Sequence, residues 1–92
     1  MEVKLQIHGD QFSFDLFDNQ IQAGYLSGKI SGNVVIAEHT IVFEQYQGRG
    51  LADKLYSSLI EFIELNNYKL HPVCSYVVKK ASQDEKVKNL II

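Results

Sequence analysis

The chain has 92 residues, of which 46% are hydrophobic and 22% charged, and this balance predicts one globular domain over residues 1–92. A formal net charge of −2 argues against a nucleic-acid surface, and the single cysteine excludes an internal disulfide. No ligand cluster suggests a metal, no apolar run approaches the ~18 residues of a membrane span, and no signal-peptide region precedes the first strand, so we expect a cytoplasmic protein.

The first half of the chain predicts an antiparallel meander. Apolar and polar residues alternate, as in Phe12, Phe14 and Leu16, and this is the period of a strand with one buried face. Short turn signals separate the segments, and short connections join antiparallel neighbours. The predicted strands are residues 2–8, 11–18, 20–30 and 34–43. The fourth is apolar over most of its length, which predicts a central strand covered on both faces.

The second half changes to a helical period. Residues 49–66 place their apolar side chains on one stripe, which predicts an amphipathic helix. A short fifth strand over residues 68–73 should lie parallel to the fourth, because a helix connects the two. A helical turn or two should follow Cys74. Residues 82–85 match a capping box, which predicts a last short helix ending near Ile91.

The most informative segment is Gln-Gly-Arg-Gly-Leu-Ala at residues 47–52, between the fourth strand and the main helix. Its two glycines permit a tight turn with uncovered N–H groups, and the helix adds unpaired N–H groups and the positive end of its dipole. Such a turn favours a phosphate or pyrophosphate. No Gly-Lys-Ser/Thr follows, which excludes a Walker loop. A dinucleotide fingerprint would have a small residue at position 53, where Asp53 stands, and this argues against a dinucleotide.

This segment resembles the acyl-CoA-binding motif of the GNAT superfamily, the Gcn-related N-acetyltransferases. The motif is Gln/Arg-x-x-Gly-x-Gly/Ala, and Gln47, Gly50 and Ala52 match its defined positions. Short single-domain members of the superfamily also share Glu-His-Thr late in the fourth strand and Pro-x-Cys after the fifth, as residues 38–40 and 72–74 do here. The resemblance implies an α+β fold: a GNAT-like mixed sheet with a four-strand meander, a main helix after the glycine turn, a parallel fifth strand and short C-terminal helices.

The resemblance also implies that acetyl-CoA or CoA is the ligand. The pantetheine arm would pair with the fourth strand where the fifth strand separates from it, and a backbone N–H group there would polarise the thioester carbonyl. The glycine turn would hold the pyrophosphate, with a charged contact from Arg49. The implied cofactor-binding residues are Thr40, Ile41, Val42, Phe43, Gln47, Gly48, Arg49, Gly50, Leu51 and Ala52.

Four side chains are candidates for chemistry. Cys74 would stand at a helix N-terminus, which favours a thiolate able to accept the acetyl group, although most lone cysteines are structural. His39 or Glu38 would deprotonate an attacking amine, and alternation along a strand predicts that only one of them faces the site. Tyr76 would protonate the departing CoA thiolate, as a tyrosine after the fifth strand does in many GNAT enzymes.

The favoured function is transfer of acetyl from acetyl-CoA to an unknown amine or thiol acceptor, either a small molecule or a protein, with no nucleic-acid or membrane partner. The alternative is a non-catalytic acyl-CoA-binding module that senses or presents the cofactor through a protein partner. Binding of a pyrophosphate-containing cofactor other than CoA is the weakest of the three interpretations. Only Gly9 and Asp10 separate the first two predicted strands, where full-length GNAT enzymes have helices that shape the acceptor site. This difference favours the binding module, whereas Cys74 and His39 favour the enzyme.

Overall fold

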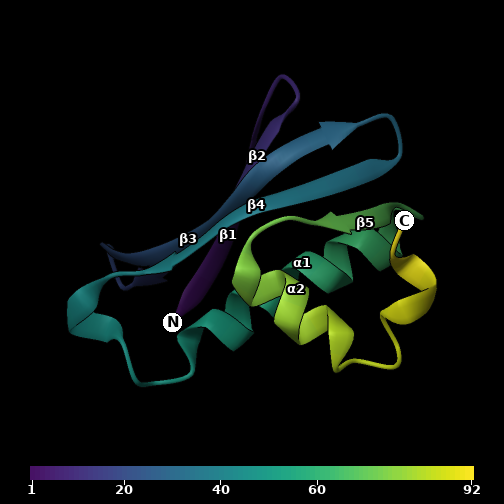
Figure 1. Cartoon of the computed structure of the whole chain (residues 1–92). Helices are drawn as coiled ribbons and strands as arrows, with labels where there is room; N and C mark the ends of the chain where they lie inside the picture. Colours follow the sequence, from purple (N-terminus) through teal and green to yellow (C-terminus); the bar gives the residue numbers. More distant parts are fainter.

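The computed structural model describes residues 1–92, which form one five-stranded sheet with the order β1-β2-β3-β4-β5 and two α-helices (Figure 1). The first four strands pair antiparallel, and β5 pairs parallel with β4. The predicted meander and fold class are therefore confirmed. The elements are β1 (Glu2–His8), β2 (Gln11–Asp18), β3 (Ile21–Ser31), β4 (Val34–Val42), α1 (Leu51–Leu65), β5 (Lys69–Pro72) and α2 (Ser75–Ser82), with short 3-10 helices η1 (Glu44–Tyr46) and η2 (Lys88–Leu90).

The core lies between the sheet and the helices. Leu16 and Leu26 of the sheet and Leu55 and Leu59 of α1 are fully buried, and burial of each leucine contributes about 1.5–3 kcal/mol. Phe62 of α1 adds an edge-to-face contact with a ring of β2, at 5.7 Å between centroids. The amphipathic stripe predicted for the main helix is thus the surface that docks it on the sheet.

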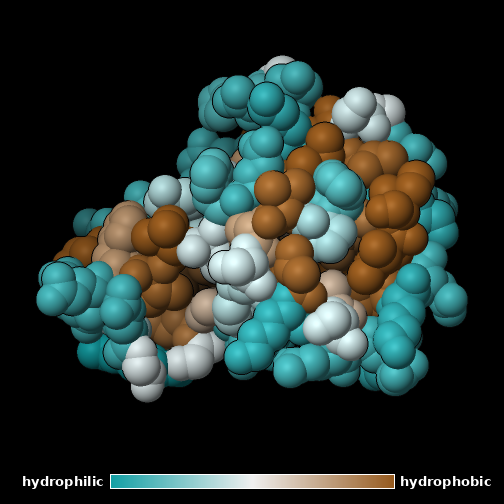
Figure 2. Space-filling model, viewed as in Figure 1, coloured by the Kyte–Doolittle hydropathy of each residue, from teal (hydrophilic) through white to brown (hydrophobic).

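The expectation that the fourth strand is covered on both faces is wrong. Val35 and Ala37 are fully buried on the helix side, but their neighbours Val34 and Ile36 are partly exposed and Ile41 is 42% exposed. The physical reason is that α1 and α2 lie on the same face of the sheet (Figure 1). In the view of Figure 1, Figure 2 shows apolar surface near the C-terminus and again near the end of β4.

The predicted start of the last short helix at residues 82–85 is wrong, whereas a short 3-10 helix, η2, does end at Leu90, next to the predicted end at Ile91. Ser82 ends α2 instead of starting a helix, because its hydroxyl donates a hydrogen bond back to the Lys79 carbonyl oxygen at 2.7 Å. The Asp84 carboxylate accepts the Lys86 N–H at 3.1 Å in a local turn. Only the 3-10 turn η2 follows, after which Ile91 forms an isolated parallel bridge to Leu70 at the edge of β5.

Candidate functional site

Strands β4 and β5 form a fork. They pair from Val34 to Ala37 on β4, and the pairing ends at Pro72 on β5. The Ala37 carbonyl oxygen then accepts N–H groups from Val73 and Cys74 at 2.9 and 3.0 Å, and the chain turns away into α2. Beyond Ala37, β4 keeps its partner β3 on one side and has no strand on the other.

The open side of β4 carries backbone groups of Thr40 and Val42. The Phe43 N–H donates to the Ala23 carbonyl oxygen of β3 at 2.8 Å, and backbone groups of successive residues alternate between the two sides of an antiparallel strand. The N–H and C=O groups of Val42 and Thr40 therefore point into the fork. In agreement, the Gln47 side-chain amide donates to the Val42 carbonyl oxygen at 2.9 Å from that side.

The glycine turn ends at an uncapped helix N-terminus. Gly48 and Gly50 adopt φ angles of 81° and 72°, in the left-handed region that favours glycine. Gly50 is the N-cap of α1, and no side chain hydrogen-bonds to the free N–H groups of the first turn. Because a side chain usually occupies those donors, their exposure leaves a site for an anion.

The fork and the glycine turn enclose one cavity of about 300 Å³, which we call the fork pocket. It contains seven of the ten residues predicted to bind the cofactor, together with Tyr76 of α2. Its lining residues are Thr40, Val42, Gln47, Gly48, Gly50, Leu51, Ala52 and Tyr76.

The other three predicted cofactor residues lie outside the fork pocket. Ile41 and Phe43 face the opposite side of the sheet, because residues of a strand alternate, and the Phe43 ring contacts the Tyr25 ring there at 6.2 Å. The Arg49 guanidinium lies over the Tyr46 ring, with its carbon 5.3 Å from the ring centroid. Arg49 thus borders the turn without lining the cavity.

Cys74 lies at the base of the fork. It is the half-buried N-cap residue of α2, as expected for a thiol between the fifth strand and a helix. Its Sγ is 3.2 Å from the Thr40 Oγ1, and either atom can be the donor. This contact joins the two arms of the fork, since Thr40 lies on β4 and Cys74 follows β5.

Tyr76 connects the fork pocket to α1 through Asp53. The tyrosine hydroxyl donates to the Asp53 carboxylate, and the Lys80 Nζ is 3.2 Å from the same carboxylate. Burial and the neighbouring carboxylate raise the pKa of Tyr76, so its hydroxyl keeps its proton near neutral pH. The hydrogen bond from Tyr76 and then the one from Lys80 lower the pKa of Asp53. Nothing in the spacing of the sequence indicated this role for Asp53.

Glu38 and His39 are not in the fork pocket. The register between β3 and β4 shifts at Ser27 and Gly28, which leaves Glu38 as an extra residue, and such a bulge redirects a side chain. Both Glu38 and His39 therefore line one hollow of about 350 Å³, the outer hollow, on the sheet face away from the helices. The expectation that their side chains point to opposite faces fails for this reason.

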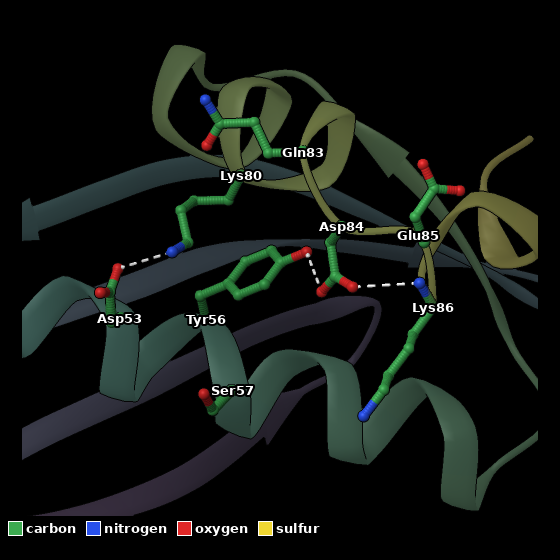
Figure 3. A pocket seen from close by; sticks show the side chains of 8 residues that line it. All are labelled: Asp53, Tyr56, Ser57, Lys80, Gln83, Asp84, Glu85 and Lys86. Carbon is green, nitrogen blue, oxygen red and sulfur yellow. Dashed lines mark hydrogen bonds and ion pairs between the residues drawn. The ribbon is translucent and has the colours of Figure 1, made fainter.

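A third hollow lies between α1 and α2 (Figure 3). Its volume is about 650 Å³, and Asp53, Tyr56, Lys80 and Asp84 are among its lining residues. Their polar groups bond to one another: Lys80 extends toward Asp53, and the Tyr56 hydroxyl donates to Asp84 at 3.4 Å (Figure 3). Because these groups are already paired within the protein, the groove links α1 to α2 and the segment after it through polar contacts.

Together these features define the class of protein. A meander followed by a glycine turn, a helix and a diverging parallel strand is a GNAT-like fold. A family model described as GCN5-related N-acetyl-transferase matches residues 11–90, and the chain belongs to this family. No helix combines the length and the apolar character that crossing a membrane would require.

Individual relatives agree with this assignment. Protein NATD1 of Mus musculus is 30% identical over 74 residues, which cover 80% of this chain and 67% of NATD1. The NMR solution structure of a GCN5-like protein from Staphylococcus aureus matches with a TM-score of 0.67 at 18% identity, over 97% of this chain and 87% of that one. AAC(6')-Iy, in complex with a bisubstrate analogue that contains CoA, matches with a TM-score of 0.63 at 17% identity. The match covers 83% of this chain and 60% of AAC(6')-Iy.

Proposed function

We propose that the protein binds acetyl-CoA in the fork pocket and transfers the acetyl group to an amine or thiol acceptor. The single observation that carries this proposal is the union of the fork and the glycine turn in one cavity. One end of that cavity offers unpaired N–H groups of a helix, and the other offers strand backbone at Thr40 and Val42. A ligand with a pyrophosphate and an amide-containing arm fits this pair of features. The CoA moiety in the complex of AAC(6')-Iy gives further support.

Each end of the pocket has a separate task in this proposal. The first-turn N–H groups of α1 hold the pyrophosphate, and the open space around Gly48 and Gly50 allows the phosphates to approach the backbone. The N–H groups of Thr40 and Val42 pair with the pantetheine arm. One of these N–H groups also polarises the thioester carbonyl and stabilises the negative charge that develops on its oxygen.

Acetyl-CoA supplies the acetyl group as an activated thioester. In the proposed covalent route, the Cys74 thiolate attacks the carbonyl carbon and forms a new S–C bond while the bond to CoA breaks. CoA leaves as a thiolate, which takes a proton from the Tyr76 hydroxyl. The acceptor amine, deprotonated by His39 or Glu38 from the other face of β4, then attacks and releases the Cys74 thiolate. In the direct route the amine attacks the CoA thioester without Cys74.

The contact between Cys74 and Thr40 supports the covalent route. The Thr40 hydroxyl is 3.2 Å from the thiol and lines the fork pocket, so it can orient the sulfur and hydrogen-bond to a thiolate. The Tyr76 hydroxyl donates a hydrogen bond to the Asp53 carboxylate in the free protein. Its acid role therefore requires the hydroxyl to exchange Asp53 for the departing sulfur.

Two measurements on the wild type test binding and transfer separately. The melting temperature should rise by several degrees with acetyl-CoA. A ligand at a hundredfold excess over its Kd increases the free energy of unfolding by about 2.7 kcal/mol. Intact mass spectrometry should detect one acetyl group, about 42 Da, on Cys74. No thermal shift with millimolar acetyl-CoA would refute the assignment of the fork pocket. A larger shift with NADH or ATP would favour another pyrophosphate cofactor.

Variants at Cys74 and His39 then separate the routes. Cys74→Ala should retain CoA affinity, since backbone groups hold the cofactor, but lose the adduct. In a direct-transfer enzyme, Cys74→Ala would still acetylate an amine and His39→Ala would slow that reaction. A purely structural thiol predicts no adduct and a loss of stability as the main effect.

The second candidate function is a non-catalytic acyl-CoA-binding module. The observation that favours it is the two-residue connection of Gly9 and Asp10 between β1 and β2, which leaves no helix over that end of the sheet. In that case acetyl-CoA binds and stabilises the protein, but neither an adduct nor CoA release appears with a panel of amines and thiols.

A further inference from the structure

The two edges of the sheet are built differently. The β5 edge is short and covered, because β5 has four residues, ends at Pro72, and has Ile91 beside it in a bridge to Leu70. The β1 edge has none of these features. β1 is seven residues long, contains neither a proline nor a bulge, and has no strand on its outer side. A long, regular and open edge strand is a template for pairing with another chain.

Alternate residues of β1 direct their backbone groups to this open edge. The Ile30 N–H of β3 donates to the Asp10 carbonyl oxygen at 2.7 Å. The even-numbered residues that follow in β2 therefore direct their backbone groups to β3, and the odd-numbered ones direct theirs to β1. These odd-numbered residues pair with the even-numbered residues of β1. The N–H and C=O groups of Val3, Leu5 and Ile7 thus point away from the sheet.

The side chains of the same three residues lie on one face of β1 and leave apolar surface beside the edge. Leu5 is 39% exposed, and Ile7 is exposed as well. Val3 and Leu5 line a shallow groove of about 210 Å³ together with Leu65 of α1, which is 75% exposed. A strand that pairs with β1 would therefore cover apolar side chains as well as free backbone groups.

The sequence of β1 is complementary to itself in one antiparallel register. When Leu5 lies opposite the partner's Leu5, Val3 lies opposite the partner's Ile7. Every outward-facing residue of both copies then exchanges backbone hydrogen bonds. On the other face of the strand Glu2 lies opposite the partner's His8, whose imidazole N–H can donate to the carboxylate. The two-fold axis passes between the two copies of Leu5 and repeats both pairs.

Other registers leave β1 less well paired. Sliding the partner by two residues in one direction places Lys4 opposite the partner's Lys4, and like charges directly opposite each other are destabilising. The same shift places Ile7 opposite the partner's Met1, outside the strand. Sliding by two residues in the other direction places Val3 opposite the partner's Gly9, in the hairpin turn. The length and the charges of β1 therefore favour one symmetric pairing.

We propose that the protein forms a symmetric dimer in which β1 pairs antiparallel with β1 of a second copy. The pairing joins the two five-stranded sheets into one continuous sheet. Glu2 contacts Lys4 of its own strand at 3.9 Å, but both side chains are mostly exposed, so the carboxylate can still accept from the partner's His8. β2 and β3 separate this edge from the fork, so both fork pockets stay open and the dimer does not depend on CoA.

Sedimentation velocity and hydrogen exchange on the isotope-labelled wild type locate the interface. A species of twice the chain mass should grow with concentration. The amides of Val3, Leu5 and Ile7 should exchange roughly tenfold or more slowly at high than at low concentration, whereas those of Lys4 and Gln6, which bond to β2, should not change. A monomer at millimolar concentration would overturn the proposal and leave the edge to an extended segment of another protein. A dimer without protection of the three amides would also overturn it.

Opposite charges at the symmetry axis test the register. Leu5→Lys and Leu5→Glu each place like charges opposite each other and should raise the dissociation constant by roughly tenfold or more. An equimolar mixture of the two variants should dimerise again, because a lysine then faces a glutamate. Ile21→Lys is the matched control, since Ile21 is an exposed apolar strand residue away from this edge, and it should dimerise as the wild type does. Undiminished dimers of both Leu5 variants, or a mixture of folded variants that stays monomeric, would contradict the proposal.

The dimer and the fork pocket are tested apart. Leu5→Lys should bind CoA as the wild type does, because β1 lies at the far edge of the sheet from the fork. If CoA binds and the wild type stays monomeric, the dimer is wrong and the fork pocket stands. If the dimer forms and CoA does not bind, the dimer stands alone. Hydrogen exchange on the wild type decides the question even where a Leu5 variant fails to fold.

Discussion

The two halves of β4 belong to one strand but have different surroundings. Residues 34–37 have a strand on each side and contribute Val35 and Ala37 to the core. Residues 38–42 have β3 on one side and the fork on the other, and four of them line two cavities: Glu38 and His39 the outer hollow, Thr40 and Val42 the fork pocket. The first half uses its backbone groups in pairing with both neighbours, whereas the missing partner of the second half leaves backbone groups for a ligand. In this protein the end of one short strand, β5, therefore determines where the site can form.

The largest effect on stability should come from a substitution on β3 where it packs against the paired half of β4. Gly28→Ala should cost roughly 3 kcal/mol or more of unfolding free energy, because the new Cβ collides with the backbone of β4 and cannot be relieved by a side-chain rotation. Urea unfolding measures the loss. Gly32→Ala is the control: its turn has a positive φ of 60° but open space, so strain alone should cost about 1–2 kcal/mol. Equal losses in the two variants would contradict the close approach.

The second-largest effect should be on CoA affinity, and it tests the glycine turn next to the unpaired half of β4. Gly50→Glu should weaken CoA binding by roughly a hundredfold, about 3 kcal/mol, because a carboxylate would face the phosphates. Calorimetry on the folded variant measures this change. Gly32→Glu carries the same charge and a similar backbone strain in a turn far from the fork, so its affinity should remain that of the wild type. Unchanged affinity in Gly50→Glu would remove the turn from the site.

The smallest effect concerns the tie between α1 and α2. The hydrogen bond from Tyr76 and the contact with Lys80 hold the pKa of Asp53 below its ordinary value of 3.8. This carboxylate therefore stabilises the fold fully above about pH 4, and the contribution is lost as the pH falls through the lowered value. Because the side chain is 60% exposed, solvent screening keeps the contribution within ~1 kcal/mol.

Comparison of the wild type with Asp53→Asn measures that contribution. The wild type should be slightly more stable in urea near neutral pH, and the gap between the two proteins should close in acid. Salt should also reduce the gap, since the Lys80 contact is partly exposed. A gap that stays constant over the whole pH range would show that the carboxylate charge does not contribute.

The sequence predicts the frame of the site better than its details. Alternation along the strands and the helical stripe predict the sheet order and α1, because both patterns are local. The glycine turn is recognisable for the same reason, and seven of the residues predicted from it and from the fourth strand line the fork pocket. Where local rules compete, the prediction fails. The Ser82 hydroxyl could cap a following helix or hydrogen-bond to a carbonyl oxygen of the preceding turn. In the structure it donates to the Lys79 carbonyl oxygen at the end of α2.

The outer hollow could not be predicted, because its residues meet only through the sheet. His8 and Glu38 are thirty positions apart in the sequence, and they share a cavity because β1, β2, β3 and β4 lie side by side in that order. The bulge that turns Glu38 toward His39 depends on the register between two strands, and a single strand carries no signal for it. Asp53 is similar, since its partner Tyr76 belongs to a helix that docks after β5.

The order of the strands has a consequence for the way the chain folds. Each of the first three strands pairs with the next one along the chain across a two-residue turn, so most of the sheet closes through local contacts, which favour rapid folding. The fork pocket needs α1, and its base needs β5 and the start of α2, so it becomes complete only when residues 69–76 dock. The meander of β1 to β4 can thus assemble early during synthesis, before the residues that complete the fork pocket have been made.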